Sequence, residues 1–381
     1  MKDKTTEPPA VSRVIETLST VGSADWNALA GDNPFVRHEF LSALEASGCV
    51  SEQTGWAPRH MTHWRKDQLV AAMPLYLKFH SYGEYVFDWA WADAYQRHGF
   101  PYYPKLLSAI PFSPVTGPRL LANEPSLRTL LLQSALDLAN EGSSLHVLFP
   151  EDNEVEMLEA GGMMIRRGVQ FHWRNIGYKT FDEFLGTLSH DKRKKIKQER
   201  RKVSESGVRC IRIAGSDIRP DDWRFFNRCY RNTYRAHHST PYLNLEFFER
   251  IGTSMPENLM LVIAELDGVR IASTLNVFNG NTLYGRYWGA TEHVPILHFE
   301  ACYYQAIEFC IERGIALFEG GAQGEHKLAR GFLPVQTRSF HWLKHEGFAD
   351  AVERFLAREA SGIDRYVDEL SDRSPFKQST S

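Results

Sequence analysis

The chain has 381 residues, of which 43% are apolar and 24% charged, and its formal net charge is -3. The apolar content is too high and the net charge too small for a disordered chain. The charge also excludes a uniformly basic nucleic-acid binder, and no DNA partner is expected. Because a single hydrophobic core rarely grows beyond about 250–300 residues, this length favours two domains.

Neither a secretory leader nor a membrane segment is expected. Residues 1–10 alternate charges and end in prolines, with no apolar run behind them. No stretch approaches the roughly 18 uncharged apolar residues of a membrane span. The five cysteines are odd in number and form no CxxC pair, which argues against a disulfide framework or a zinc knuckle. We therefore expect a cytoplasmic protein without a bound metal.

A weak internal repeat runs along the chain. The elements of its first copy are strands at 67–77 and 84–89, a helix at 127–140 and a strand at 145–149. The elements of its second copy are strands at 267–277 and 282–288, a helix at 298–313 and a strand at 315–318. Both helices are expected to end at a left-handed glycine, Gly142 or Gly314. The repeat predicts an α/β protein with two similar domains, and chance recurrence of a common pattern is the alternative.

The first copy contains additional residues, an aromatic-rich insertion at 91–119. An acidic stretch followed by Gly161 and Gly162 marks a boundary after the first copy. We therefore expect an N-terminal domain over residues 1–165 and a C-terminal domain over residues 166–381.

A strongly basic segment opens the second half. Residues 190–202 contain eight Lys or Arg and two acidic residues. The apolar residues at roughly helical spacing are Leu185, Leu188, Ile196 and Val203. They predict an amphipathic helix at 185–203 whose basic face suits the phosphates of a nucleotide, coenzyme A or RNA. Lys192, Arg193 and Lys195 are the predicted phosphate ligands, and a merely solvated face is the alternative.

Gly285 interrupts the predicted strand at 282–288. A glycine inside a strand often marks a bulge, which can aim a backbone N–H at a substrate carbonyl. Simple close packing would also explain this glycine. The loop after the strand leads to a helix N-terminus at His298, and helix N-termini favour anions.

The densest reactive segment is the glycine-rich loop at 319–332 after the last strand of the repeat. Its acids, bases and cations are Glu319, Glu325, His326, Lys327 and Arg330. Loops positioned by a sheet edge commonly carry function. These side chains could hold a base and oxyanion-stabilising cations, whereas a solvated loop or a capping network is the alternative.

Several of these segments resemble the FemAB-like group of N-acyltransferases within the GNAT superfamily. The matching segments are Asn33-Pro-Phe35, Gly83-Glu-Tyr-Val-Phe-Asp-Trp-Ala-Trp-Ala92, Tyr102-Tyr-Pro-Lys-Leu106, Pro114-Val-Thr-Gly-Pro-Arg119, Leu283-Tyr-Gly-Arg-Tyr-Trp-Gly289, His298-Phe-Glu300 and the loop 319–332. The resemblance implies two tandem GNAT-like domains with mixed central sheets. It also implies transfer of an acyl or aminoacyl group to a primary amine, of a cell-wall precursor or a small metabolite.

In the GNAT pattern, the bulge near Gly285 would receive the donor carbonyl and the helix at His298 would take the donor pyrophosphate. The usual Q/R-x-x-G-x-G/A loop is absent between Trp288 and His298. The donor therefore remains either acyl-CoA or aminoacyl-tRNA. Each would be a co-substrate and not a tightly bound cofactor, and tRNA is a possible partner. Lys327 to Phe332 resembles the K-x-x-F-G element near the Fem acceptor site, where a Lys or Arg stabilises negative charge. A non-catalytic module that binds a nucleotide-linked metabolite or a partner protein is the alternative function, and the oligomeric state is not specified.

Overall fold

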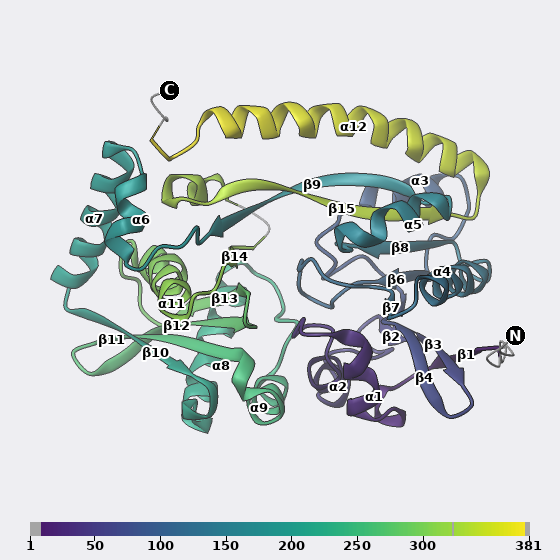
Figure 1. The fold of residues 1–381 in the computed structure, drawn as a ribbon, viewed down its shortest axis with the longest axis horizontal. Coiled ribbons are helices and arrows are strands. Elements are labelled where there is room, and N and C mark those ends of the chain that lie inside the picture. Colours follow the sequence, from purple (N-terminus) through teal and green to yellow (C-terminus); the bar gives the residue numbers. More distant parts are fainter. Residues whose placement is uncertain (1–8, 322–323, 378–381) are drawn as a thin grey trace, which may run out of the picture. The chain divides into compact units, whose positions relative to one another are not determined.

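A computed structural model describes residues 9–321 and 324–377 (Figure 1). The described residues form two compact units. Unit 1 contains the chain up to Arg167 together with Arg338–Ala360, and unit 2 contains Gly168–Thr337 together with the residues from Ser361 onward. The expected division after residue 165 lies two residues before the first break. Residues 338–360, expected in the second domain, pack instead in unit 1.

Unit 1 contains an antiparallel sheet and a mixed sheet. The antiparallel sheet has the order β1 (Val11–Ile15), β3 (His60–Arg65), β4 (Gln68–Met73) and β7 (Leu121–Ala122). The mixed sheet has the order β2 (Trp56–Pro58), β5 (Tyr76–Lys78), β6 (Lys105–Ser108), β8 (Ser144–Leu148) and β15 (Leu333–Leu343). Strands β6 and β8 are parallel, whereas β8 pairs antiparallel with Ser339–Leu343 of β15. This pairing is one reason why the segment after residue 338 belongs to unit 1.

The helices of unit 1 are α1 (Ser23–Ala30), α2 (His38–Ala46), α3 (Trp89–Arg97), α4 (Pro125–Ala139), α5 (Val155–Ala160) and the first part of α12 (Glu346–Asp372). Helix α4 buries the stripe Leu127, Leu131 and Ala135 in the core, as helical spacing of apolar residues predicts. Val352 and Leu356 of α12 join the aromatic residues of α3 in a second cluster.

Most predicted elements of the first copy are present, with three corrections. The strand predicted at 67–77 is two strands, β4 and β5, which belong to different sheets. The strand predicted at 84–89 is wrong, because the chain turns there and α3 begins at Trp89. Tyr85 has a φ of 64°, which an extended strand cannot accommodate. The left-handed glycine predicted at Gly142 is also wrong, since α4 ends at Asn140 with right-handed geometry.

Unit 2 is also built on strands in a mixed arrangement. Its order is β10 (Val208–Ala214), β11 (Leu259–Leu266), β12 (Val269–Phe278), β13 (Thr282–Ala290), β14 (Leu317–Glu319) and β9 (Met164–Arg174). Strands β13 and β14 are parallel, and the other neighbours are antiparallel. The helices of unit 2 are α6 (Phe181–Thr187), α7 (His190–Glu205), α8 (Pro220–Ala236), α9 (Leu245–Ser254), α10 (Leu297–Phe299), the π-helical turn η5 (Glu300–Tyr304), α11 (Gln305–Arg313), the 3-10 helix η6 (Glu325–Arg330) and the end of α12.

The basic helix predicted at 185–203 is interrupted. It consists of α6 and α7, which are separated at Leu188 and Ser189. There the Ser189 N–H donates a hydrogen bond to the carbonyl of Pro375 (2.9 Å) instead of continuing the helix. The predicted stripe is nevertheless confirmed, since Leu185, Leu188, Ile196 and Val203 are all buried.

The helix predicted at 298–313 contains the π-helical turn and ends, as predicted, at a left-handed Gly314 with a φ of 69°. In a π-helical turn each N–H bonds to the carbonyl five residues earlier, which brings side chains five positions apart to one side. None of the helices among the described residues has the length and apolar character of a membrane span.

The predicted bulge at Gly285 is present. Leu275 of β12 lies opposite Tyr287 of β13, but the next residue, Asn276, lies opposite Gly285. Arg286 is therefore one extra residue in β13 at this point. Such an insertion interrupts the ladder of hydrogen bonds and bends the strand.

Candidate functional site

A small cavity of about 90 Å³ opens at the bulge of β13 in unit 2. Its wall includes Asn276 of β12 together with Gly285 and Arg286 of the bulge. The wall also includes His298, Cys302 and Tyr303. The π-helical turn explains how His298 and Tyr303, five positions apart, face one cavity.

The reactive loop predicted at 319–332 borders this cavity. Gly320, directly after β14, is part of the cavity wall. A Cβ atom on Gly320 would lie 3.4 Å from Cδ of Lys327, so the Lys327 side chain packs against the back of that wall. A Cβ atom on Gly321 would lie 3.9 Å from both the Gly285 carbonyl oxygen and Nζ of Lys327. The glycines thus let Lys327 approach the bulge. Ala322 and Gln323 lie outside the described residues.

Lys327 is 3% exposed, and its Nζ donates a hydrogen bond to the carbonyl of Gly321 (3.0 Å). Burial, with a contribution from the nearby positive charge of Arg286, lowers the pKa of Lys327 to about 8. The ammonium therefore carries its charge at neutral pH and loses it in mildly alkaline solution. Such a group can stabilise an anion that forms beside the bulge.

His326 and Tyr303 form a hydrogen-bonded pair at the cavity. Nε2 of His326 lies 3.0 Å from the Tyr303 hydroxyl, and the direction of the bond depends on the tautomer of the imidazole. Burial lowers the pKa of His326, so its ring is neutral near pH 7. Burial also raises the pKa of Tyr303, which keeps its hydroxyl protonated. The pair can therefore accept or pass on a proton.

His298, predicted as a ligand of the donor pyrophosphate, lies in the cavity wall between Trp288 and Tyr303. Burial lowers the pKa of His298 to about 4. The neutral ring offers a hydrogen bond and no positive charge to a phosphate.

Other predicted site residues are engaged by side chains of unit 2. Glu319 is 3% exposed and its Oε2 lies 3.4 Å from a guanidinium nitrogen of Arg286. The Arg330 guanidinium donates hydrogen bonds to Glu199 (2.8 Å) and to the carbonyl of His326 (2.6 Å). It also lies 3.4 Å from the centre of the Phe299 ring. Arg330 therefore faces α7 and holds the backbone of η6.

Glu325 points to the C-terminal helix. Its carboxylate accepts hydrogen bonds from the Tyr366 hydroxyl (2.9 Å) and from Arg373 (3.0 Å). These two bonds lower the pKa of Glu325. The carboxylate is exposed, so it stays ionised near neutral pH. The structure thus places Gly285 and His298 in the cavity wall, with His326 behind Tyr303 and Lys327 behind Gly320. Glu325 and Arg330 lie at the two ends of η6.

A basic groove of about 440 Å³ lies along α7. Its residues are His190, Arg193, Lys194, Lys197, Gln198 and Arg201. Of the three predicted phosphate ligands, only Arg193 lines the groove, whereas Lys192 and Lys195 lie elsewhere on α7. Residues 193, 197 and 201 are four positions apart and share one helix face. Helical periodicity could therefore have identified Lys194, Lys197 and Arg201 from the sequence.

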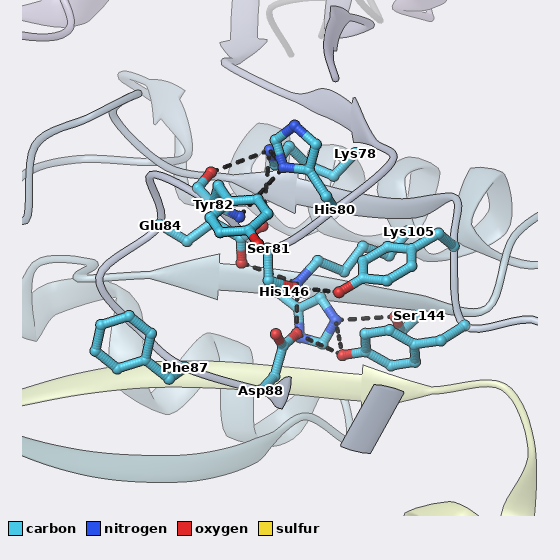
Figure 2. Close-up of polar contacts among 12 residues, drawn as sticks. Lys78, His80, Ser81, Tyr82, Glu84, Phe87, Asp88, Lys105, Ser144 and His146 are labelled. Atoms are coloured by element: carbon cyan, nitrogen blue, oxygen red, sulfur yellow. Dashed lines mark hydrogen bonds and ion pairs between the residues drawn. The ribbon is translucent and has the colours of Figure 1, made fainter. Parts of the chain in front are cut away.

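Unit 1 contains a buried charge network that the sequence reasoning did not anticipate (Figure 2). Lys105 is fully buried and donates to Ser81 (2.9 Å) and Glu84 (2.8 Å), and it also bonds to Asp88. Nζ of Lys78 lies 3.9 Å from the other Glu84 oxygen. Three side chains of the 81–88 turn therefore converge on a single ammonium group.

The network has strongly perturbed pKa values. Burial raises the pKa of Glu84 to about 7 and lowers that of Lys78 to about 7. Burial opposes ionisation of Asp88, but the charge of Lys105 outweighs it and holds the pKa of Asp88 below its ordinary value. Burial likewise opposes the charge of Lys105, whose pKa is raised because Glu84 and Asp88 outweigh that effect. These bonds tie the 81–88 turn to Lys105 of β6, so we assign the network to holding the turn.

Sequence reasoning also missed several residues of the unit 2 site. Arg286 and Asn276 are placed by the bulge register, and Tyr303 and Cys302 by the π-helical turn. Glu199 lies on the basic helix, where an acidic residue among many cations gives no signal of a buried partner. Among the described residues, no group of three or more His, Cys, Asp or Glu side chains could hold a metal ion.

Comparison with known proteins adds to this geometry. A family model for FemAB-like proteins, described as peptidoglycan biosynthesis/recognition, matches residues 17–378. The crystal structure of FemX is similar at 12% identity with a TM-score of 0.56, and the alignment covers 87% of this chain and 98% of that one. The C-terminal DUF2156 domain of a putative lysylphosphatidylglycerol synthetase from Agrobacterium fabrum is similar at 8% identity with a TM-score of 0.52, covering 87% of this chain and 93% of that one. No curated protein matches the sequence.

At these identities the structural likenesses concern the fold alone, and they agree with the α/β architecture described above. The α/β fold with two units and mixed strand pairings agrees with what the resemblance to tandem GNAT-like proteins implied. Since the family model spans nearly the whole sequence, the chain belongs to the FemAB-like family of peptidoglycan biosynthesis/recognition.

Proposed function

We propose that the protein is an N-acyltransferase that moves an acyl or aminoacyl group from an activated donor to a primary amine. The observation that carries the proposal is the bulge of β13, which opens into a cavity faced by the Tyr303–His326 pair and backed by Lys327. Membership of a family of peptidoglycan biosynthesis/recognition favours the amine of a cell-wall precursor as acceptor. The donor is acyl-CoA or aminoacyl-tRNA.

The donor carbonyl would lie at the bulge. As the amine attacks, the carbonyl carbon becomes tetrahedral and its oxygen becomes an anion. A backbone N–H near Gly285 and the ammonium of Lys327 would stabilise that anion, and one such donor typically contributes about 3 kcal/mol to the transition state. The small cavity and the buried surroundings strengthen this electrostatic effect because water is largely excluded.

Two protons must leave the amine. An ammonium substrate loses its first proton before the attack, and the second leaves as the amide forms. Neutral His326 can accept a proton through the Tyr303 hydroxyl, which lines the cavity. The leaving thiolate of coenzyme A, or the leaving ribose oxygen of tRNA, takes up one proton. No covalent intermediate on the protein is needed.

Both donors carry phosphates, and the basic groove of α7 would bind them. Lys and Arg side chains pair with phosphate oxygens, and four of the groove residues are Lys or Arg. A tRNA would neutralise several of these charges at once. Its affinity would therefore fall steeply as salt rises, with a slope of roughly 0.7–0.9 per neutralised phosphate in a double-logarithmic plot. Coenzyme A would raise the melting temperature by mass action.

The test uses radiolabelled acetyl-CoA and aminoacyl-tRNA as donors and a peptide with one free amine as acceptor. Transfer from either donor by the wild type, reduced at least about 100-fold in Lys327→Ala, supports the proposal. Lys179→Ala, which changes an exposed lysine of the same unit, is the matched control. Transfer from neither donor, or equal transfer by Lys327→Ala, contradicts the proposal. Binding of a donor without transfer would identify the non-catalytic module instead.

A further inference from the structure

The inner face of the basic helix α7 is bound to the candidate site. Glu199 is 7% exposed, and its Oε1 accepts a hydrogen bond from Arg330 at the end of η6 (2.8 Å). Its Oε2 accepts a hydrogen bond from the hydroxyl of Tyr304 in the π-helical turn. One carboxylate on α7 thus joins the two elements that supply His326 and Tyr303 to the cavity.

Arg330 connects Glu199 to the backbone of η6. Besides Glu199, its guanidinium bonds to the carbonyl of His326 at 2.6 Å and stacks over the Phe299 ring. Arg330 is only 2% exposed. A buried charge that loses its partner is strongly destabilised, so without Glu199 the guanidinium would move toward water and release the carbonyl of His326.

The opposite end of η6 is held by α12. Glu325, the first residue of η6, accepts hydrogen bonds from Tyr366 and Arg373 (2.9 and 3.0 Å). Leu328 in the middle of η6 belongs to the same hydrophobic cluster as Leu370 of α12. His326 and Lys327 therefore lie between two fixed points, one on α7 and one at the C-terminal end of α12.

We infer that Glu199 and Arg373 are positioning residues that clamp η6 at its two ends and thereby place His326 and Lys327 at the cavity. The inference rests on the proposed function for the roles of those two side chains. It also explains why an acidic residue of this predominantly basic helix is buried on its inner face. None of the contacts that form the clamp requires a donor or an acceptor to be bound.

The experiment measures the pKa of Lys327 and the hydrogen exchange of backbone amides in residues 326–332 of the full chain. Lys327 is titrated by its rate of acetylation with acetic anhydride, followed by mass spectrometry of peptides. Its charged and titratable neighbours are Arg286, Cys302, His172, His298 and His326. The variants are Glu199→Gln and Arg373→Gln. Glu205→Gln is the control, because Glu205 is an exposed residue of α7 paired only with Arg201 in the described contacts.

In Glu199→Gln we expect the pKa of Lys327 to rise from about 8 toward 10.5, since a released η6 admits water, and exchange in residues 326–332 should become roughly tenfold faster or more, because local opening becomes easier. In Arg373→Gln, which removes an exposed ion pair, both changes should have the same direction and be smaller. Adding Arg330→Gln to Glu199→Gln should change the pKa of Lys327 little further, because both substitutions remove the same link between α7 and η6. If Glu199→Gln does not fold, Arg373→Gln alone tests the clamp. Its ion pair lies at the surface, so this variant is expected to fold.

An unchanged pKa of Lys327 in the folded variants, or an equal change in Glu205→Gln, overturns the clamp. Because no donor or acceptor is used, that result leaves the proposed transferase function in place. Conversely, a wild type that transfers no label while the variants show the expected shifts would overturn the proposed function and leave the clamp intact.

Discussion

Replacement of Lys105 by Met in unit 1 should lower the free energy of unfolding by an amount that follows from the contacts of Lys105. Lys105 is fully buried and bonds to Glu84, Asp88 and Ser81 (Figure 2). At pH 8 both carboxylates are ionised, because the pKa of Glu84 is about 7 and that of Asp88 lies below its ordinary value. Lys78, with a pKa of about 7, is then mostly neutral. Lys105 is therefore the main charge that balances the two buried carboxylates.

Removal of one partner from a buried ion pair costs about 3–5 kcal/mol. For a unit of this size, each kcal/mol lowers the melting temperature by about 2–4 °C, so Lys105→Met should melt roughly 6–20 °C lower at pH 8. The assay is calorimetry together with urea unfolding at pH 8 and pH 6. Arg97→Met, which removes a surface ion pair with Asp93, should cost about 0.5 kcal/mol or less.

The loss of stability in Lys105→Met should be smaller at pH 6 than at pH 8. The folded pKa of Glu84 is raised above its unfolded value, so the folded state holds a proton that the unfolded state has released. Stability conferred by that proton is lost as pH rises through about 7 and regained as pH falls. Without Lys105 the pKa of Glu84 rises further. Lowering the pH from 8 to 6 therefore stabilises the variant more than it stabilises the wild type. A cost below about 1 kcal/mol at pH 8, or an equal cost at both pH values, would refute the reasoning.

Two further predictions concern unit 2. If charged Lys327 stabilises the oxyanion, the transfer rate should fall above about pH 8, where Lys327 loses its proton. In Lys327→Arg this alkaline decline should disappear, because arginine keeps its charge. A decline at the same pH in both proteins would exclude this role for Lys327. Gly320→Ala places a Cβ 2.8 Å from the Phe332 ring and should cost about 1–3 kcal/mol in urea unfolding. Gly280→Ala, which meets nothing within 4 Å, should change stability by less than about 0.5 kcal/mol, and equal effects would show that the wall beside Lys327 is not tightly packed.

Local patterns predicted the parts of the fold that neighbouring residues determine. The bulge at Gly285 and the left-handed Gly314 follow from the conformations that glycine permits. The buried stripe Leu185, Ile196 and Val203 follows from helical periodicity even though the helix is interrupted. Each of these features depends on the residue type and its close neighbours along the chain.

Contacts between distant residues account for what the sequence did not predict. The 84–89 segment has the composition of a strand, but Glu84 and Asp88 turn inward to Lys105, which is 21 and 17 residues away. Arg330 pairs with Glu199 across 131 residues, and no spacing rule relates the two. A cation in a reactive loop is a reasonable candidate for catalysis until its buried partner is known. The role of Arg330 therefore depended on the tertiary structure.

The central claim is that the cavity at the bulge of β13 catalyses transfer from a phosphate-bearing donor to an amine. Single-turnover transfer of label from a donor to an amine-bearing peptide, compared between the wild type and Lys327→Ala, tests it most directly. The account predicts transfer by the wild type from acyl-CoA or aminoacyl-tRNA, and a loss of at least about 100-fold in the folded variant. Transfer from neither donor, or an unchanged rate in the variant, would contradict it.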